Sequence, residues 1–354
     1  MENWLTAAIV IVSIIFLARS DIKLHLEDKH LQGQAVGHSQ GVYSEDSCDE
    51  FFFGMPFPKI KSDQTGLVKL CQTQQHDGYV GPAVYATLFS ITDRIPVYSA
   101  DVITLYPNST GYMRPDEKYW NRVALELCNI DPSNLPLFPI SSRLGSAGSD
   151  TVACGANQAI NRDYKGNWEA LGVDRGHLNP NAINFQDQES QVGTFTLTNA
   201  APQFSAFNQI AWEQYECVTK YIVMKYTPLQ RVYVVTGTMG QAKDPAGNLL
   251  WMNDGRLDKK NRVKVPEYYW KAVCYPGNPW DSTSPWAYAI IDKNIKDAGN
   301  SSPDNIMPVE KFSSMYFEDD VFAEPCLSAT MGPIQNLFDD WTNHVNSICH
   351  GRRR

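Results

Sequence analysis

Short stretches rich in β-branched and aromatic residues recur along the chain and predict a core built largely of strands. These stretches cover residues 79–80, 84–89, 95–98, 231–236, 263–273 and 286–291. Residues 131–151 are rich in Pro, Ser and Gly and predict a long loop. The sequence contains no internal repeat and no linker that separates two halves. We therefore expect one core domain over residues 61–330, preceded by an extension at 21–60 and followed by a tail at 331–354, tied down by a cysteine.

A strand–strand–helix unit is predicted from residue 174 onwards. Residues 174–177 form the end of the first strand, and residues 194–198 alternate polar and apolar side chains, as a second strand does. Residues 200–206 then form a loop that leads into a helix starting near Asn208. The apolar face of this helix consists of Ile210, Ala211, Tyr215, Val218 and Ile222.

Helix geometry separates the carboxylates that follow Asn208. Glu216 lies roughly 80° from Asn208 around the helix and about 12 Å further along its axis. Glu213 lies roughly 140° from Asn208 and faces elsewhere. Glu216 can therefore approach a group held by Asn208 through water, whereas Glu213 cannot. Two plainer interpretations stay open: Asn208 as a helix N-cap, and Glu216 as a solvated surface residue.

Composition places the chain among globular proteins. Of its 354 residues 43% are hydrophobic, and 30 Lys and Arg stand against 39 Asp and Glu, a formal net charge of -9. These values exclude disordered and collagen-like chains. The acidic balance argues against a protein that binds nucleic acid through bulk charge. No basic stripe flanks the polar unit either, because residues 94–175 carry as many acidic as basic side chains, within one.

The N-terminal segment predicts export from the cell. Residues 4–18 form an apolar run, shorter than the roughly 20 residues that a membrane-spanning helix needs. The run ends in Ala18-Arg19-Ser20, a small-residue ending of the kind that a signal peptidase cleaves. We therefore expect residues 1–20 to be a signal peptide and the mature chain to be secreted without a membrane span. A short membrane anchor is the alternative.

Cysteine usage agrees with the secretory route. The cysteines are even in number, spread along the chain and without a C-x-x-C pair, so they predict up to four disulfides rather than a zinc site. They are Cys48, Cys71, Cys128, Cys154, Cys217, Cys274, Cys326 and Cys349. Their pairing is left open, because spacing alone does not choose among the combinations. Two sequons, at Asn108 and Asn300, predict N-linked glycosylation.

The polar residues of the strand–strand–helix unit fit the hydrolysis of a phosphodiester. That reaction needs a base that activates water and a cation that stabilises the phosphoryl oxygens. His177 fits the base, since an ordinary histidine is largely neutral at pH 7, and Arg175 can pair with a phosphate through two N–H groups. The amide oxygen of Asn208 is a hard ligand that suits Mg²⁺, and Glu216 can order the waters around that ion. The sequence lacks the Asp and Glu cluster of a two-metal nuclease, so one metal with one direct protein ligand is expected.

Three motifs of this unit together resemble the DNA/RNA non-specific endonuclease family. They are Asp174-Arg-Gly-His177, Asn199-x-x-Pro-Gln203 and Asn208-Gln-x-Ala-Trp-x-x-x-Glu216, in this order. Their ordered combination is specific, and the resemblance extends over roughly residues 75–300. It implies an α+β fold, with a central antiparallel sheet flanked by helices and a ββα-metal (His-Me finger) active site.

The resemblance also implies roles for individual residues. His177 falls on the general base, and Asn208 falls on the single direct ligand of Mg²⁺, a place that Mn²⁺ also fits. Glu216 falls on a water-mediated metal contact. Arg175 and Asn199 fall on supporting positions of the active site.

Two functions remain open at this level. The resemblance implies a secreted, Mg²⁺-dependent endonuclease that acts on DNA and RNA, with a further phosphate-binding arginine upstream, for which Arg114 is the candidate. The acidic charge supports a different hypothesis, a secreted, disulfide-bonded interaction module on the same fold with weak or no nuclease activity. Loss of hydrolysis in His177→Ala is expected only of the enzyme. Oligomeric state and preference for DNA or RNA are not given by the sequence.

Overall fold

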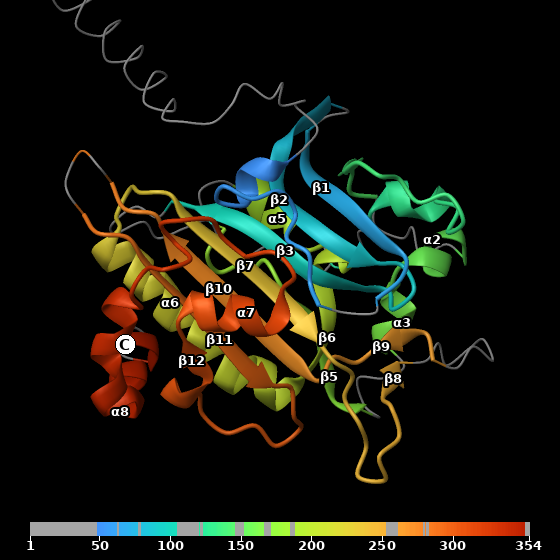
Figure 1. Ribbon diagram of the computed structural model, residues 1–354. Helices are drawn as coiled ribbons and strands as arrows, with labels where there is room; N and C mark the ends of the chain where they lie inside the picture. The colour runs from blue at the N-terminus through green and yellow to red at the C-terminus, as the bar shows by residue number, and fades with distance from the viewer. Residues whose placement is uncertain are drawn as a thin grey trace, which may run out of the picture. The chain divides into compact units, whose positions relative to one another are not determined.

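The computed structural model describes most of the chain from Cys48 onwards (Figure 1). The described residues are 48–61, 64–76, 79–104, 120, 123–145, 152–165, 171–184, 188–252, 261–278, 280 and 283–350. The predicted signal peptide at 1–20, most of the extension at 21–60, Asn108 and Arg114 lie outside these residues. Within the described ranges, no helix combines the length and the apolarity that a membrane crossing needs.

An eight-stranded sheet forms the centre of the fold, in the order β12-β11-β10-β7-β3-β2-β1-β4. Its strands are β1 (Leu67–His76), β2 (Tyr79–Ser90), β3 (Ile95–Ile103), β4 (Ile140–Ser142), β7 (Val232–Met239), β10 (Tyr268–Tyr275), β11 (Trp286–Lys293) and β12 (Ile306–Met307). Neighbouring strands pair antiparallel, except β1 and β4, which are parallel. The strands predicted at 79–80, 84–89, 95–98, 231–236 and 286–291 are confirmed, and with the helices beside them the sheet confirms the α+β class. The strand predicted over 263–273 is divided: residues 263–264 pair outside the central sheet, and β10 begins at Tyr268.

Short helices and two small two-stranded sheets accompany the central sheet. The small sheets pair β5 (Val173–His177) with β6 (Ala200–Phe204) and β8 (Trp251–Met252) with β9 (Val263–Lys264). The helices and helical turns are η1 (Asp49–Phe51), η3 (Leu125–Asn129), α2 (Val152–Asn157), α3 (Asn161–Lys165), α5 (Gln188–Gly193), η4 (Leu197–Asn199), η5 (Phe207–Trp212), α6 (Glu213–Tyr226), η6 (Pro303–Asn305), α7 (Val309–Tyr316), η7 (Gly332–Asp340), α8 (Trp341–Val345) and η8 (Asn346–His350).

Strands β1 and β4, at one edge of the sheet, differ from the sequence prediction. Strand β1 was not predicted, and the loop predicted over 131–151 contains β4. Both differences follow from polar residues that are buried in a strand. The carbonyl of Ser142 accepts hydrogen bonds from the side chains of Gln72 and Thr73, at 2.9 and 3.3 Å. Such pairing between distant strands satisfies buried polar groups that a local hydrophobic pattern assigns to a loop.

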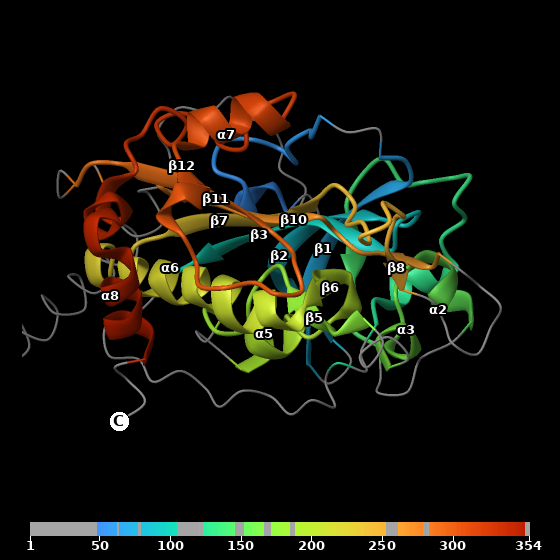
Figure 2. The same cartoon turned by 90° about the horizontal axis from the view of Figure 1, so that it is seen from below.

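Helices cover both faces of the central sheet (Figure 2). On one face α7 packs against β10, with the rings of Phe312 and Trp270 5.2 Å apart. On the other face lies α6, whose Tyr215 is fully buried. Because successive residues of a strand point to opposite faces, Trp270 points towards α7 and Lys271 towards α6.

Four disulfides join all eight cysteines, in agreement with the predicted number. The pairs are Cys48–Cys71, Cys128–Cys154, Cys217–Cys349 and Cys274–Cys326. The third pair ties the C-terminal segment to α6, where the ring of Trp341 lies 6.2 Å from that of Tyr215. Cys349, within the segment 331–354, is thus bonded to α6.

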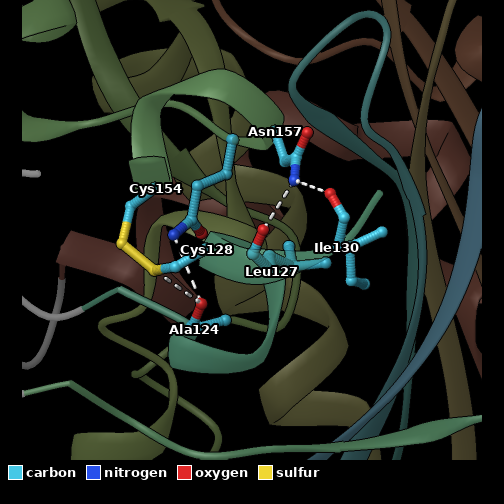
Figure 3. The surroundings of a disulfide bond; sticks show 7 residues. Ala124, Leu127, Cys128, Ile130, Cys154 and Asn157 are labelled. Carbon is cyan, nitrogen blue, oxygen red and sulfur yellow. Dashed lines mark hydrogen bonds between the residues drawn. A yellow bond between two sulfur atoms is a disulfide. The ribbon is translucent and has the colours of Figure 1, made fainter. Parts of the chain in front are cut away.

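The second disulfide joins η3 to α2 (Figure 3). Beside it, the amide of Asn157 donates to the carbonyls of Leu127 and Ile130, at 2.7 and 2.8 Å. A covalent bond and two hydrogen bonds therefore hold α2 against η3.

A buried ion pair fixes α3 to the segment that precedes β9. Arg262 donates from Nε and Nη2 to the two carboxylate oxygens of Asp163, at 2.6 and 3.0 Å, and both side chains are buried. Asp163→Ala leaves the guanidinium in the interior without its counter-charge, so we expect the free energy of unfolding to fall by about 3–5 kcal/mol. Denaturant unfolding measures this loss. The control is Glu126→Ala, which breaks the exposed pair with Arg143 and should cost at most about 1 kcal/mol; equal losses would contradict the prediction.

Asp101 on β3 is a buried carboxyl group whose ionisation reduces stability. Burial raises the pKa of Asp101 to about 7, against the opposing effects of the Asn184 amide and the Lys271 ammonium; the Tyr85 hydroxyl also faces it. The folded state thus holds this proton more tightly than the unfolded chain does. Its stabilising effect is complete below about pH 4 and is lost as the pH rises to about 7.

We therefore expect Asp101→Asn to change how stability depends on pH. In the wild type, Asp101 lowers the free energy of unfolding by about 1.4 kcal/mol for each pH unit between about pH 4 and pH 7. This contribution should be missing in the variant, whose stability should fall less over the same interval. Denaturant unfolding at several pH values compares the two proteins. Parallel curves would show that the carboxyl group titrates at its ordinary pKa.

Candidate active site

The site begins with the small two-stranded sheet of β5 and β6. The two strands pair antiparallel, with Asp174 opposite Gln203 and His177 opposite Ala200. The predicted position of the second strand was wrong: it covers residues 200–204 rather than 194–198. All five residues of β6 are buried, so the strand shows no alternation, and Leu197 belongs to the turn η4 that precedes it. The first strand, with His177 at its end, is as predicted.

Gly176 is required by the close approach of the two strands. A Cβ atom at this position would lie 2.7 Å from Cβ of Gln203, a distance that real side chains do not tolerate. Gln203 is itself fully buried and cannot move out of the way. The glycine between Arg175 and His177 thus lets β6 pack directly against β5.

The helix after β6 starts with a wide turn. Residues 207–212 form a π-helix, in which the Glu213 N–H bonds to the carbonyl of Asn208, five residues earlier. A wide turn rotates less per residue, so Asn208 and Glu216 lie closer to one face than the roughly 80° of a regular helix. The same turn exposes Ile210, which was predicted on the apolar face. The other predicted apolar residues are buried: Ala211, Tyr215, Val218 and Ile222.

Asp174, on β5, joins the β5–β6 sheet to this helix through hydrogen bonds. Its Oδ2 accepts hydrogen bonds from the side-chain amides of Asn208 and Gln209, at 2.8 and 2.9 Å, and its Oδ1 accepts one from Ser205, at 2.7 Å. Asn208 lies inside the helix and does not cap it, so the N-cap interpretation was wrong. Because the amide nitrogen is bound to Asp174, the amide oxygen of Asn208 is left to bind a cation.

Arg175 is held from two sides by residues distant in sequence. Its Nη2 donates to Oδ1 of Asn161, and its guanidinium lies 5.1 Å from the ring of Tyr164 and 5.8 Å from that of Trp120. Asn161 and Tyr164 belong to α3. These contacts leave the guanidinium little freedom, which favours bidentate pairing with a planar anion.

The imidazole of His177 lies in an aromatic pocket. Its ring is 4.4 Å from that of Trp120 and 4.9 Å from that of Phe195, which are themselves 5.0 Å apart. The histidine is half-buried, whereas both neighbours are buried. Packing of this kind fixes the orientation of the imidazole. Neither Trp120 nor Tyr164 was predicted as a site residue, because no local pattern relates their rings to His177 and Arg175.

Asn199 supports the segment that follows His177. It is fully buried; its amide donates to the carbonyls of Asn179 and Thr194, at 2.9 and 3.0 Å, and accepts from the backbone N–H of Asn179, at 2.9 Å. Its side chain thus bonds to backbone groups, which makes it a scaffold of the loop after β5.

Glu216 lies half-buried on α6, one turn after Trp212. It interacts electrostatically with the buried ammonium of Lys271, which argues against a purely solvated surface role. Glu213, by contrast, is exposed.

The comparison with known proteins decides the family. The family model described as DNA/RNA non-specific endonuclease matches residues 143–321, just over half of the chain. The chain belongs to this family. His177, Asn208 and Glu216 lie within the matched region, and Arg114 lies before it.

Three similar proteins give the extent of the likeness. The human Endonuclease domain-containing 1 protein is 31% identical over 255 residues, which cover 71% of this chain and 43% of that protein. Human mitochondrial Endonuclease G is 30% identical over 156 residues, which cover 44% of this chain and 47% of that protein. The chain thus spans less than half the length of both relatives. A chain in the crystal structure of the EndoG/EndoGI complex is 18% identical, with a TM-score of 0.48 over 83% of this chain and 98% of that chain.

Two side chains near β5 carry oxygen donors of the kind that a hard divalent cation prefers. The described residues contain no group of three or more His, Cys, Asp or Glu side chains that could hold a metal ion. The available donors are the oriented amide oxygen of Asn208 and the carboxylate of Glu216 on the following turns. Oxygen donors of this kind suit Mg²⁺, which keeps most of its waters.

Proposed function

We propose that the chain is a secreted, Mg²⁺-dependent endonuclease that hydrolyses phosphodiester bonds in DNA and RNA. The observation that carries the proposal is the set of contacts around β5. Asp174 orients Asn208 from one side of this strand, while Arg175 and His177, which alternate with it, are fixed by aromatic rings on the other.

In the proposed reaction, His177 accepts a proton from the water that attacks phosphorus. Arg175 binds the phosphoryl oxygens and stabilises their charge as the bond to the leaving oxygen breaks. Asn208 would hold the cation directly and Glu216 through water. The chemistry that Mg²⁺ supplies there is neutralisation of charge on the phosphoryl and leaving oxygens. Asn199 keeps the loop after His177 in place, and we retain Arg114 as the proposed second phosphate-binding arginine.

Export and glycosylation belong to the same proposal. Four disulfides are typical of chains that fold in an oxidising compartment. Asn300 is exposed, and its Oδ1 accepts a hydrogen bond from Gln214 at 3.0 Å. A glycan attaches through the amide nitrogen, so this bond can persist in the modified protein. We propose glycosylation at Asn300 and at Asn108.

The net charge of -9 favours one alternative, an interaction module that uses the same fold. The test that separates the two functions is digestion of supercoiled plasmid and of single-stranded RNA by the secreted protein at low salt. The endonuclease cuts both in Mg²⁺, stops in EDTA and recovers when Mg²⁺ is restored. No cleavage of either substrate in Mg²⁺ or Mn²⁺ would favour the interaction module.

A further inference from the structure

A lysine lies fully buried beneath the candidate active site. Lys271, in the middle of β10, has no exposed surface, and its Nζ donates to Oγ1 of Thr236 on the neighbouring strand β7, at 2.5 Å. Lysine is almost never fully buried unless it is paired with an opposite charge. A hydroxyl group satisfies one of its three N–H groups and none of its charge.

The side chain of Lys271 contacts Trp212, directly before α6, the helix that carries Glu216. Its Nζ lies 5.6 Å from the centre of the Trp212 ring. Trp212 precedes Glu216 by four residues, so the two share a face of the helix, and a helical side chain leans back over the residue four positions before it. The carboxylate of Glu216 therefore leans towards the ring that the ammonium already contacts.

The charges around Lys271 are consistent with this geometry. Burial lowers the pKa of Lys271 to about 8, while the carboxylate of Glu216 and, less strongly, that of Asp101 act to raise it. Asp101 is buried on β3, the strand on the far side of β7, and points to the same face of the sheet. Of the two carboxylates, Glu216 has the stronger effect on the lysine.

An apolar side chain would fill this place at a lower cost. Burying an ammonium group carries a desolvation penalty that well-packed apolar residues avoid. On the neighbouring strand β11, Lys271 pairs with Ile290, which is fully buried on the same face of the sheet. A buried ammonium group in this layer therefore indicates an interaction with an opposite charge, and the carboxylate with the strongest effect on Lys271 is that of Glu216.

We propose that Lys271 is a positioning residue, which holds the carboxylate of Glu216 in place beside Asn208. The inference rests on the proposed function, since it assigns Glu216 a role towards a divalent cation. Lys271 lies below α6 and does not touch the substrate.

The test combines Lys271→Met with Glu216→Gln in a double-mutant cycle. Methionine matches the unbranched side chain of lysine up to Cε and removes the charged ammonium group. The first readout is the affinity for Mn²⁺, measured by electron paramagnetic resonance without nucleic acid. We expect each single variant to bind Mn²⁺ about tenfold more weakly, in the range of residues that orient metal ligands, and the double variant to bind no more weakly than either. Wild-type affinity in Lys271→Met, or losses that multiply in the double variant, would overturn the proposal.

Further variants separate positioning from folding. Ile290→Val alters the same buried layer without touching the charge, so it should leave the affinity for Mn²⁺ unchanged. If Lys271→Met does not fold, Asp101→Asn combined with Lys271→Met removes both charges and leaves no buried carboxylate without a partner; the same tenfold loss is expected. A wild-type affinity in this double variant would overturn the proposal.

A second readout is cleavage of plasmid DNA. Lys271→Met should lower kcat and leave KM for DNA unchanged, because the lysine is not in reach of the substrate. If wild-type protein neither binds Mn²⁺ nor cleaves, the proposed function fails and this inference fails with it. If the wild type does both and Lys271→Met behaves identically, only the role of Lys271 is refuted.

Discussion

Replacing His177 by alanine lowers kcat for plasmid cleavage by a factor of about 100–10,000, the range that a general base contributes. The reason is the position of His177 at the end of β5, where Trp120 and Phe195 fix the orientation of the imidazole. A small residue cannot accept the proton from water. Initial rates on supercoiled plasmid measure the loss, and circular dichroism checks that the fold persists.

The matched control is His344→Ala. His344 lies on α8, in the C-terminal segment, and has no part in the β5–β6 sheet. The His344→Ala variant should cleave plasmid at the wild-type rate. Full activity in His177→Ala would rule out the proposed base, and equal losses in both histidine variants would point to a general effect on the preparation.

Asp174→Ala weakens the binding of Mn²⁺ by a factor of about 10–100 and lowers the cleavage rate with it. Without this carboxylate, the amide of Asn208 loses the acceptor that fixes which of its two atoms faces the cation. Titration with Mn²⁺ measures the affinity. The expected loss is large because Asp174 also binds Ser205 and Gln209, so its removal frees the whole first turn of the helix.

A similar pair elsewhere in the chain controls for the hydrogen bond itself. In an exposed loop, Asp244 accepts a bond from the amide of Asn248 at 2.9 Å. Asp244→Ala removes the same kind of contact and should leave the affinity for Mn²⁺ unchanged. Wild-type affinity in Asp174→Ala would show that the hydrogen bond to Asn208 does not orient a metal ligand.

The features of the candidate site that depend on neighbouring residues along the chain were predicted from the sequence. The order of strand, strand and helix was correct, and so was the family, because the motifs lie close together along the chain. The second strand was placed too early, because all of Ala200–Phe204 is buried between neighbouring elements and carries no alternation. The N-cap interpretation of Asn208 was wrong, since the contact that binds its side chain comes from Asp174, a residue on another element.

The remaining features depend on contacts between distant segments. Tyr164 lies on α3 and Trp120 lies far before the motif along the chain, so only tertiary packing brings their rings to Arg175 and His177. The π-helix at 207–212 was not predicted, because the apolar pattern of this segment indicated a regular helix. Buried polar residues such as Lys271 and Asp101 contradict the hydrophobic pattern of their strands, and their partners lie on other elements.

In the proposed site, Asn208 holds one metal ion and His177 acts as a separate base. The most direct test is a titration of His177→Ala and Asn208→Ala with Mn²⁺, followed by electron paramagnetic resonance. We expect the inactive variant His177→Ala to bind one Mn²⁺ ion per chain with wild-type affinity. Asn208→Ala should bind none over the same range of Mn²⁺ concentration. Loss of the ion from His177→Ala, or its retention in Asn208→Ala, would contradict this division of roles.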